Sequence, residues 1–216
     1  MIPKHFHWIW LGSPVPKKQK EWIFSWLLKH PGFQYSVWQD FTDLQNQAYF
    51  DKAANWAAKA DIARYEILYR YGGVYIDTDF ECFKPIDIFL EKDALLVKEP
   101  GDAVANSLIG LKAGDPFIKY CIDSLPAWID EHANDGTNVQ SGPVFFTEMC
   151  KRFGMKDFVE DTTLFYPYNI KEPKFIYPQS YAAHHWEASW ISAKRRNKRK
   201  FRNFLKKVYR GLKRAV

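Results

Sequence analysis

The stretch YGGVYIDTDFECFKPID at 71–87 constrains the fold more than any other part of the sequence. It contains a Gly-Gly pair at 72–73, an apolar run, and then acidic side chains at Asp77, Asp79 and Glu81. A glycine pair supplies the left-handed cap that ends a helix, and the apolar run predicts a buried strand. A helix that passes directly into a buried strand, with acidic groups where the strand ends, indicates an α/β sheet with polar chemistry at one edge.

The rest of the chain alternates in the same way. The patterns predict strands at 5–12, 35–40, 74–77, 94–99 and 106–112, and helices at 16–30, 55–71, from 116 onward and after 141–143, followed by an aromatic stretch at 182–190. Pro126 is expected to bend or break the helix that begins at Pro116. Strands separated by helices predict an α/β sheet that is covered on both faces.

Length and composition favour one domain. The chain has 216 residues, of which 47% are hydrophobic, and this is enough for a sizeable core. Charge and proline interrupt the apolar run at 1–18, so we expect neither a signal peptide nor a membrane span there. The three cysteines, Cys82, Cys121 and Cys150, match no metal or redox spacing and are expected to be free thiols in a reducing compartment.

Basic charge is concentrated at the end of the chain. Residues 192–216 hold twelve of the 31 Lys and Arg residues and no Asp or Glu, which leaves 19 basic against 25 acidic residues in 1–191. We therefore expect a mildly acidic domain at 1–191 and a separate basic tail at 192–216.

The tail also has a helical pattern. On a helical wheel, its apolar residues fall within an arc of about 100° and its basic residues fall outside that arc. The apolar set is Phe201, Phe204, Leu205, Val208 and Leu212. This separation predicts a basic amphipathic helix that lies on an anionic membrane surface, and hence a cytoplasmic protein bound peripherally to the inner face of the membrane.

Asp77 and Asp79 suggest a metal site. Two residues apart on a strand, they would share one face with Cα atoms about 6.6 Å apart. Two carboxylates at that distance repel by roughly 2.5 kcal/mol at an effective dielectric of 20. A hard cation such as Mg²⁺ or Mn²⁺ would offset this repulsion. Taken alone, the pair fits a solvated turn better, with both carboxylates capping backbone amides.

The surrounding residues resemble a known family. KADIARYEILYRYGGVYIDTDFECFKP at 59–85 resembles the core motif of glycosyltransferase family 32, which includes the yeast initiating α-1,6-mannosyltransferase and the glucosylating domains of large clostridial toxins. IPKHFHWIWLG, YSVWQD, NSLIGLKAGDPF, SGPVFF and YAAHHWEASW resemble further family segments in the same order, over about residues 2–191. The resemblance implies a GT-A type nucleotide-binding fold, with a mixed, mainly parallel sheet flanked by helices.

The resemblance also implies roles for single residues. Asp77 would contact the donor sugar or ribose and assist the metal, and Asp79 would ligate Mn²⁺ or Mg²⁺ directly. Trp10 would stack on the base of a nucleotide-sugar. Asp61 and Arg64 would hold the sugar hydroxyls and the diphosphate. From the residues alone, Asp61 and Arg64 could equally be a surface ion pair one helical turn apart.

Other candidates follow from position. His184 and His185 are adjacent and point to opposite sides of an extended chain, so one is expected to be structural and the other to ligate the metal or donate to the diphosphate. His185 is the one we assign to the metal. Trp8 is expected in the core. Three further polar residues are weaker candidates, because acidic residues in turns and polar residues that cap helices are frequent without function. They are Glu81, Asn106 and Ser141, and of these we assign Asn106 to donor binding.

The prediction is a metal-dependent glycosyltransferase with Asp77, Asp79 and Arg64 as its catalytic residues. It would move a sugar, from a UDP-sugar in preference to a GDP-sugar and with retention, to a glycan or lipid-linked saccharide in cell-surface polysaccharide synthesis. A metal-dependent phosphoester hydrolase is the alternative enzyme, but it would need more ligands than the sequence offers. A nucleic-acid-binding protein would use the basic tail but leaves these residues without a role, so no nucleic acid partner is expected.

Overall fold

The computed structural model describes residues 1–101, 103–169 and 174–187. The description below concerns the unit Met1–Trp186. The predicted amphipathic helix of the tail and the predicted boundary between residues 191 and 192 lie outside the described residues. Within the described part of the chain, no helix is both long enough and apolar enough to cross a bilayer.

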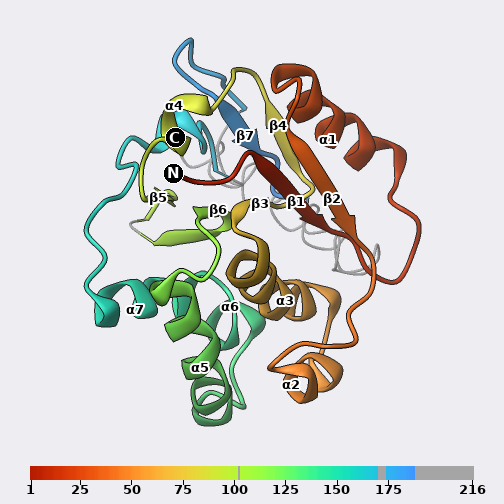
Figure 1. The fold of residues 1–216 in the computed structure, drawn as a ribbon, viewed down its shortest axis with the longest axis vertical. Helices are drawn as coiled ribbons and strands as arrows, with labels where there is room; N and C mark the ends of the chain where they lie inside the picture. Colours follow the sequence, from red (N-terminus) through yellow and green to blue (C-terminus); the bar gives the residue numbers. More distant parts are fainter. Residues whose placement is uncertain (102, 170–173, 188–216) are drawn as a thin grey trace, which may run out of the picture. The chain divides into compact units, whose positions relative to one another are not determined.

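A five-stranded sheet forms the centre of the fold (Figure 1). Its strands lie in the order β2, β1, β3, β6, β5, with the bounds β1 His5–Ile9, β2 Gln34–Trp38, β3 Gly73–Ile76, β5 Ala94–Lys98 and β6 Val104–Leu111. β1 pairs in parallel with β2 and β3, whereas β6 is antiparallel to both β3 and β5. Only β6 is reversed, so the prediction of a mixed, mainly parallel sheet is confirmed.

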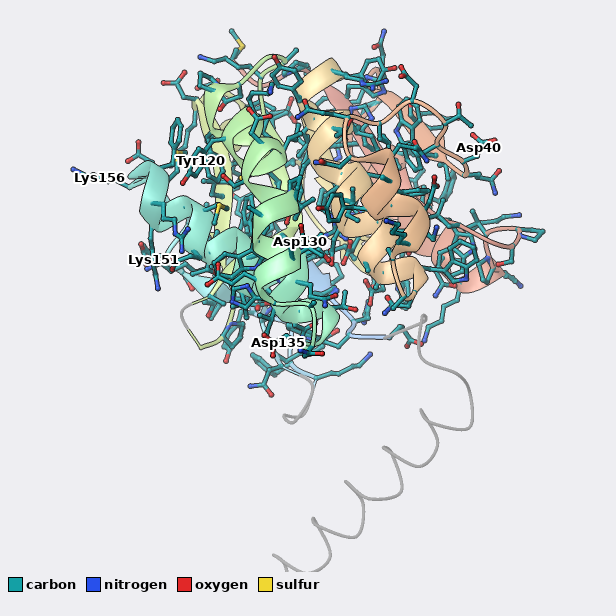
Figure 2. All side chains as sticks on the ribbon, turned by 90° about the horizontal axis from the view of Figure 1, so that it is seen from below. Asp40, Tyr120, Asp130, Asp135, Lys151 and Lys156 are labelled. Carbon is teal, nitrogen blue, oxygen red and sulfur yellow. The ribbon has the colours of Figure 1, made fainter. Side chains whose placement is uncertain are left out.

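Alternating side chains on these strands pack into two hydrophobic cores, one on each face of the sheet. Phe6, Trp8 and Val74 point to one face, and Ile9 and Tyr75 to the other. The second face is covered by α3 Trp56–Tyr71, α5 Pro116–Glu131 and α7 Pro143–Phe153, with the short helices α2 Gln47–Lys52 and α6 Thr137–Gln140 beside them. Figure 2 shows this helical layer from below, with Asp130 and Lys151 on its outer side.

The first face carries a helix and a second, smaller sheet. α1 Lys17–Lys29 packs here with the two-stranded antiparallel sheet of β4 Phe80–Cys82 and β7 Ala182–His184. The short helices α4 Asp87–Leu90 and η1 Thr162–Leu164 complete this side. The expectation that helices cover both faces is therefore confirmed, although β4 and β7 share one of them with α1.

The connection from α3 to β3 depends on the glycine pair. The Gly72 N–H donates to the Leu68 carbonyl at 2.9 Å and ends the helix, with φ of +62° at Gly72 and +90° at Gly73. A Cβ on Gly73 would overlap the carbonyl oxygen of His5. Two glycines let the helix turn into a strand that lies directly against β1.

Two details differ from the sequence-based expectations. Pro126 does not break α5, because the Ile122 carbonyl, which loses its helical partner there, accepts a hydrogen bond from Nδ2 of Asn46 at 2.9 Å. Asp77 and Asp79 do not lie on a strand. β3 ends at Ile76, and a turn closed by the Phe80 N–H and the Asp77 carbonyl at 3.2 Å carries both carboxylates. The predicted free thiols are confirmed, since Cys82, Cys121 and Cys150 are unpaired and buried.

The crowding at Gly73 predicts a large stability loss on substitution. Gly73→Ala should lower the free energy of unfolding by about 3 kcal/mol or more, because the new methyl group meets the His5 carbonyl in a backbone conformation that already disfavours it. Gly114→Ala is the matched control. Gly114 also has a positive φ, but a methyl group there would meet no atom within 4 Å, so this substitution should cost about 1 kcal/mol. Urea unfolding measures both, and equal losses would contradict the packing argument.

Candidate functional site

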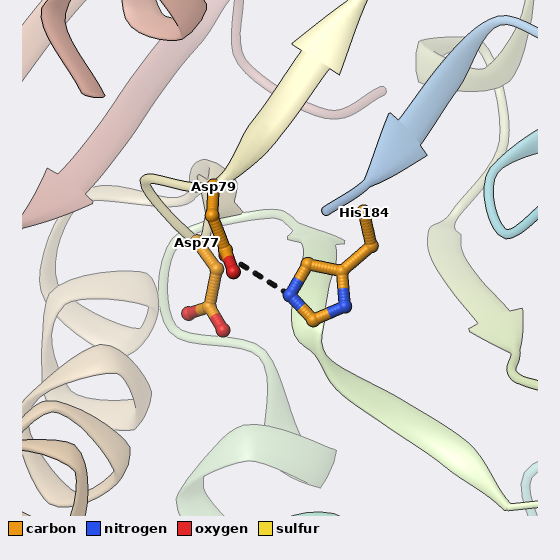
Figure 3. A group of neighbouring side chains, drawn as sticks. All are labelled: Asp77, Asp79 and His184. Atoms are coloured by element: carbon orange, nitrogen blue, oxygen red, sulfur yellow. Dashed lines mark hydrogen bonds and ion pairs between the residues drawn. The ribbon is translucent and has the colours of Figure 1, made fainter. Parts of the chain in front are cut away.

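A group of three ionisable side chains lies where β3 ends. Asp77 and Asp79 come from the turn after β3, and His184 is the last residue of β7 (Figure 3). One potential ligand atom from each of the three lies within 4.8 Å of the others, and Nε2 of His184 is 3.0 Å from Oδ1 of Asp79. Phe80 and His184 are paired residues of the β4–β7 sheet, so this pairing brings His184 to the turn.

His185 faces a different set of partners. Its backbone N–H donates to the Asp79 carbonyl at 2.8 Å, while its ring nitrogens lie 2.9 Å from Oε2 of Glu81 and 2.7 Å from the Tyr168 hydroxyl. Its ring also stacks on Trp22 with centroids 4.3 Å apart. The prediction that the two histidines point to opposite sides is correct. The assignment of a metal to His185 stays a prediction, and the geometry favours His184, because the His184 ring and not the His185 ring lies beside the Asp77 and Asp79 carboxylates.

A buried ion network joins this group to α3. Nη2 of Arg64 lies 2.9 Å from Oδ1 of Asp61 and 3.3 Å from Oδ1 of Asp77. Arg64 and Asp61 are 3% and 5% exposed, so the alternative of a surface ion pair is wrong. Tyr75 supports the network twice, because its hydroxyl donates to Asp77 at 2.7 Å and its ring lies 4.4 Å from the Arg64 guanidinium carbon.

A polar residue of β6 and another in the segment just before α7 complete the network. Nδ2 of Asn106 donates to Asp61 Oδ1 at 2.8 Å, and the Ser141 hydroxyl donates to Asp61 Oδ2 at 3.0 Å. Arg64 Nη1 donates to the Asn106 carbonyl at 2.5 Å, and Arg64 Nε donates to the Ala60 carbonyl at 3.2 Å. Asn106 therefore acts on Asp61 in this structure, and its predicted contact with a donor stays a prediction.

Burial and mutual repulsion shift the acidities in the site. Burial raises the pKa of Asp61 to about 6 in spite of Arg64 beside it. Burial also raises the pKa of Asp77, with the Arg64 charge acting in the opposite direction. For His184, burial lowers the pKa, but the neighbouring carboxylates of Asp79, Asp77 and Glu99 together outweigh it and the net shift is upward. Asp61 is buried and Asp77 and Asp79 are partly buried, so the shifts follow from burial and from the closeness of like charges.

Glu99 is a site residue that the sequence analysis missed. It directly follows β5, and burial raises its pKa while it interacts electrostatically with His184 and Asp77. β5 and β3 run in the same direction, so their carboxyl ends reach the same edge of the sheet. An acidic residue at the end of a predicted strand, as at Asp77, was the signal that could have identified it.

Trp8 and Trp10 differ in their burial, as expected. Trp8 is fully buried in the core, which confirms its predicted place. Trp10 follows β1 at the same edge as Asp77, is only half-buried, and donates its indole N–H to the Ser13 hydroxyl at 3.1 Å. Its half-exposed ring is compatible with base stacking, and that role stays a prediction.

Comparison with known families identifies this region. Residues 16–99 match the glycosyltransferase sugar-binding region containing a DXD motif, a segment that includes Asp61, Arg64, Asp77 and Asp79. Over these residues the chain is similar to DXD-containing glycosyltransferases. The match supports the recognised resemblance and the transferase class. The phosphoester hydrolase and the nucleic-acid-binding protein gain no support.

Three relatives illustrate the range of similar sequences. Inositol phosphoceramide mannosyltransferase 3 of Schizosaccharomyces pombe is 28% identical over 68% of this chain and 44% of its own length. Mannosyl phosphorylinositol ceramide synthase SUR1 of Saccharomyces cerevisiae is 32% identical over 58% of this chain and 35% of its own length. An uncharacterised glycosyltransferase, L373, of Acanthamoeba polyphaga mimivirus is 26% identical over 88% of this chain and 84% of its own length. The chain spans about half or less of the length of the fungal relatives.

Solved structures of glycosyltransferases share the fold. The PaToxG glycosyltransferase superposes with a TM-score of 0.59 at 19% identity, over 70% of this chain and 69% of that one. A glycosyltransferase involved in glycosylation of the major capsid of PBCV-1 superposes with a TM-score of 0.52 at 12% identity, over 91% of this chain and 98% of that one. The described residues therefore have the GT-A type fold that the sequence predicted.

The buried network predicts a pH-dependent loss of stability in Arg64→Met. Removing the guanidinium leaves the Asp61 and Asp77 carboxylates uncompensated and should cost about 3–5 kcal/mol near pH 8. The folded-state pKa of Asp61 is already about 6, above its unfolded value, and the loss of Arg64 raises it further. Such a carboxyl favours the folded state when it is protonated, so the loss should shrink as the pH falls from 8 toward 5.5.

Urea unfolding of Arg64→Met and the unsubstituted protein at both pH values tests this prediction. Arg70→Met is the control, because Arg70 is half-exposed and pairs with Glu66 and Asp43 at 3.7 and 3.3 Å. It should cost about 1 kcal/mol or less and show little pH dependence. A pH-independent loss in Arg64→Met would mean that packing, and not charge, governs this site.

Proposed function

We propose that the domain transfers a sugar from a nucleotide-sugar to an acceptor hydroxyl, using a divalent cation held by Asp77, Asp79 and His184. The observation that carries this proposal is the convergence of the three side chains within 4.8 Å on the DXD turn of a glycosyltransferase domain. The acidic turn then has a chemical purpose, because it recruits the positive charge that a departing diphosphate needs.

The side chains fit a divalent cation. Two carboxylates and one imidazole form a mixed oxygen and nitrogen donor set, and carboxylate oxygens suit both Mg²⁺ and Mn²⁺. The imidazole is less suited to Mg²⁺, which prefers an all-oxygen shell, so we favour Mn²⁺. The cation would supply Lewis-acid stabilisation of the diphosphate leaving group. The cation would be held at the carboxyl edge of the sheet by Asp77, Asp79 and His184.

Arg64 has a positioning role in this proposal. Its donors go to Asp61, Asp77 and two backbone carbonyls, and its side chain is only 4% exposed. A diphosphate would have to displace these partners in order to accept a hydrogen bond from it. Arg64 therefore holds the Asp77 carboxylate in place and adds long-range positive charge, instead of gripping the diphosphate as a catalytic residue.

The donor and the acceptor follow from the resemblance and the relatives. We expect a UDP-sugar in preference to a GDP-sugar, and transfer with retention. Two of the relatives are named for sugar transfer to inositol phosphoceramide or for synthesis of its mannosylated form. We therefore propose a lipid-linked saccharide or glycolipid as the acceptor, with cell-surface polysaccharide synthesis as the process. A screen of UDP- and GDP-sugars with Mn²⁺ tests the donor by product formation.

The metal proposal predicts different results for the two histidines. Mn²⁺ should raise the melting temperature of the unsubstituted protein, because a ligand that binds only the folded state stabilises it. Asp79→Asn and His184→Gln should lose most of this rise and at least about 100-fold in transfer rate. His185→Gln is the matched control and should keep the Mn²⁺ effect. A normal Mn²⁺ effect in His184→Gln, or full turnover in EDTA, would contradict the proposed ligand set.

Base stacking by Trp10 gives a second prediction. Trp10→Ala should weaken nucleotide binding by about 1–3 kcal/mol, the range for stacking of a base on an aromatic ring. It should leave the Mn²⁺-dependent rise in melting temperature unchanged. Trp10→Phe should retain most of the affinity because it keeps a flat ring. Calorimetric titration with UDP and GDP measures the effect, and an unchanged Kd in Trp10→Ala would assign Trp10 to structure alone.

The basic tail is proposed to bind an anionic membrane surface, which would hold the protein peripherally on the inner face of the membrane. Its Lys and Arg residues would each contribute up to about 1 kcal/mol near anionic lipids. Removing residues 192–216 should therefore weaken binding to anionic liposomes at least about ten-fold, while transfer to a soluble acceptor persists. Co-sedimentation measures the binding. Full binding after truncation, or equal binding to neutral vesicles, would refute this role of the tail.

A further inference from the structure

The outer side of α1 carries two large apolar side chains. Trp22, Ile23 and Trp26 face inward and are buried, whereas Phe24 and Leu28 are 57% and 64% exposed. Phe24 and Leu28 are four residues apart, so they lie next to each other on the helix surface. Two large exposed apolar side chains side by side on one helix mark a candidate contact surface.

Positive charge surrounds these two side chains. α1 carries four lysines and one acidic residue, although residues 1–191 as a whole are acidic. Lys20 lies one turn before Phe24, Lys29 directly follows Leu28, and Lys17 is at the start of the helix. Glu21 is 4.0 Å from Lys17 in a highly exposed pair and offsets little of this charge. We call this surface the α1 face: Lys17, Lys20, Phe24, Leu28 and Lys29.

We propose that the α1 face docks on an anionic lipid bilayer, independently of the basic tail. Phe24 and Leu28 would enter the boundary between headgroups and acyl chains, and the lysines would contact anionic headgroups. A nucleic acid would use the lysines but gives no reason for the two exposed apolar side chains. A second copy of the α1 face, or the chain's own basic tail, would bring like charges together.

The inner side of α1 is tied to the site. The Trp26 indole N–H donates to the Phe80 carbonyl at 3.1 Å, and the Ser25 hydroxyl accepts the Cys82 N–H at 2.8 Å. Trp22 stacks on His185, the residue after His184. α1 therefore packs directly on the β4–β7 sheet that carries His184. A bilayer on the outer side of α1 would keep the site near lipid headgroups, which suits the proposed lipid-linked acceptor.

A single fluorescent label tests the proposal in the full chain. Phe24→Cys is labelled with an environment-sensitive thiol dye, and labelling is selective because the native cysteines Cys82, Cys121 and Cys150 are buried. Ile88→Cys is the matched control, since Ile88 is 59% exposed on α4. Each labelled protein is mixed with phosphatidylcholine vesicles that contain or lack phosphatidylserine, and with duplex DNA. Circular dichroism melting confirms that both variants fold.

The expected result is a blue-shifted emission at position 24 on phosphatidylserine vesicles, quenched by brominated lipid, with no shift at position 88. In the Phe24→Cys protein, Lys17, Lys20 and Lys29 are also replaced by Gln. This variant should need a vesicle concentration roughly ten-fold higher or more to reach half of the shift at low salt. Transfer to a soluble acceptor should be unchanged in that variant, so failure of this inference is distinct from failure of the proposed activity.

Each of the following results would overturn the inference. The first is an unshifted label at position 24 on vesicles that co-sediment with the protein, which would assign membrane binding to the tail alone. The second is an equal shift at positions 24 and 88. The third is a shift produced by DNA, and the fourth is a shift on concentrating the protein without vesicles, which would indicate self-association. Absence of any vesicle binding overturns it equally.

Discussion

The Arg64 guanidinium, buried between Asp61 and Asp77, is the interaction on which the rest of the site depends. Burying one cation and two carboxylates is costly, and the cost is offset only while each group keeps its partners. The partners come from α3, the end of β3 and β6, so the network fixes these elements relative to one another. The Asp77 carboxylate is consequently held in place before any ligand arrives, which is the preorganisation that electrostatic catalysis requires.

The β4–β7 pairing supplies the second constraint. The sheet places His184 opposite Phe80, and the His185 backbone N–H bonds to the Asp79 carbonyl. Those contacts close the DXD turn against a segment more than a hundred residues later in the sequence. Glu81 and Tyr168 hold His185 on the other side of the chain. The two adjacent histidines thus divide their work, because His185 fixes the strand and His184 faces the carboxylates.

Local patterns predicted the elements that local forces determine. The glycine pair, the apolar run after it and the acidic residues at the strand end located α3, β3 and the acidic turn correctly, because helix caps and strand ends are encoded by neighbouring residues. The burial of Arg64 could not be read from its spacing to Asp61, since surface and buried ion pairs share that spacing. Choosing between His184 and His185 required the register of β7, and the continuity of α5 at Pro126 required Asn46, which is distant in the sequence.

The charge balance of the site favours an order of binding. The Asp77 carboxylate interacts electrostatically with the carboxylates of Asp61, Asp79 and Glu99, and with Arg64 and His184. Burial opposes the ionised form of Asp61, Asp77 and Glu99. A site of this sign repels a nucleotide diphosphate, whatever the fit of the base or the sugar. In the proposed reaction, charge neutralisation at Asp77 and Asp79 therefore precedes or accompanies donor binding. The lysines of α1 lie outside this acidic group, so the proposed attraction to an anionic surface and the proposed attraction to a cation belong to separate parts of the same domain.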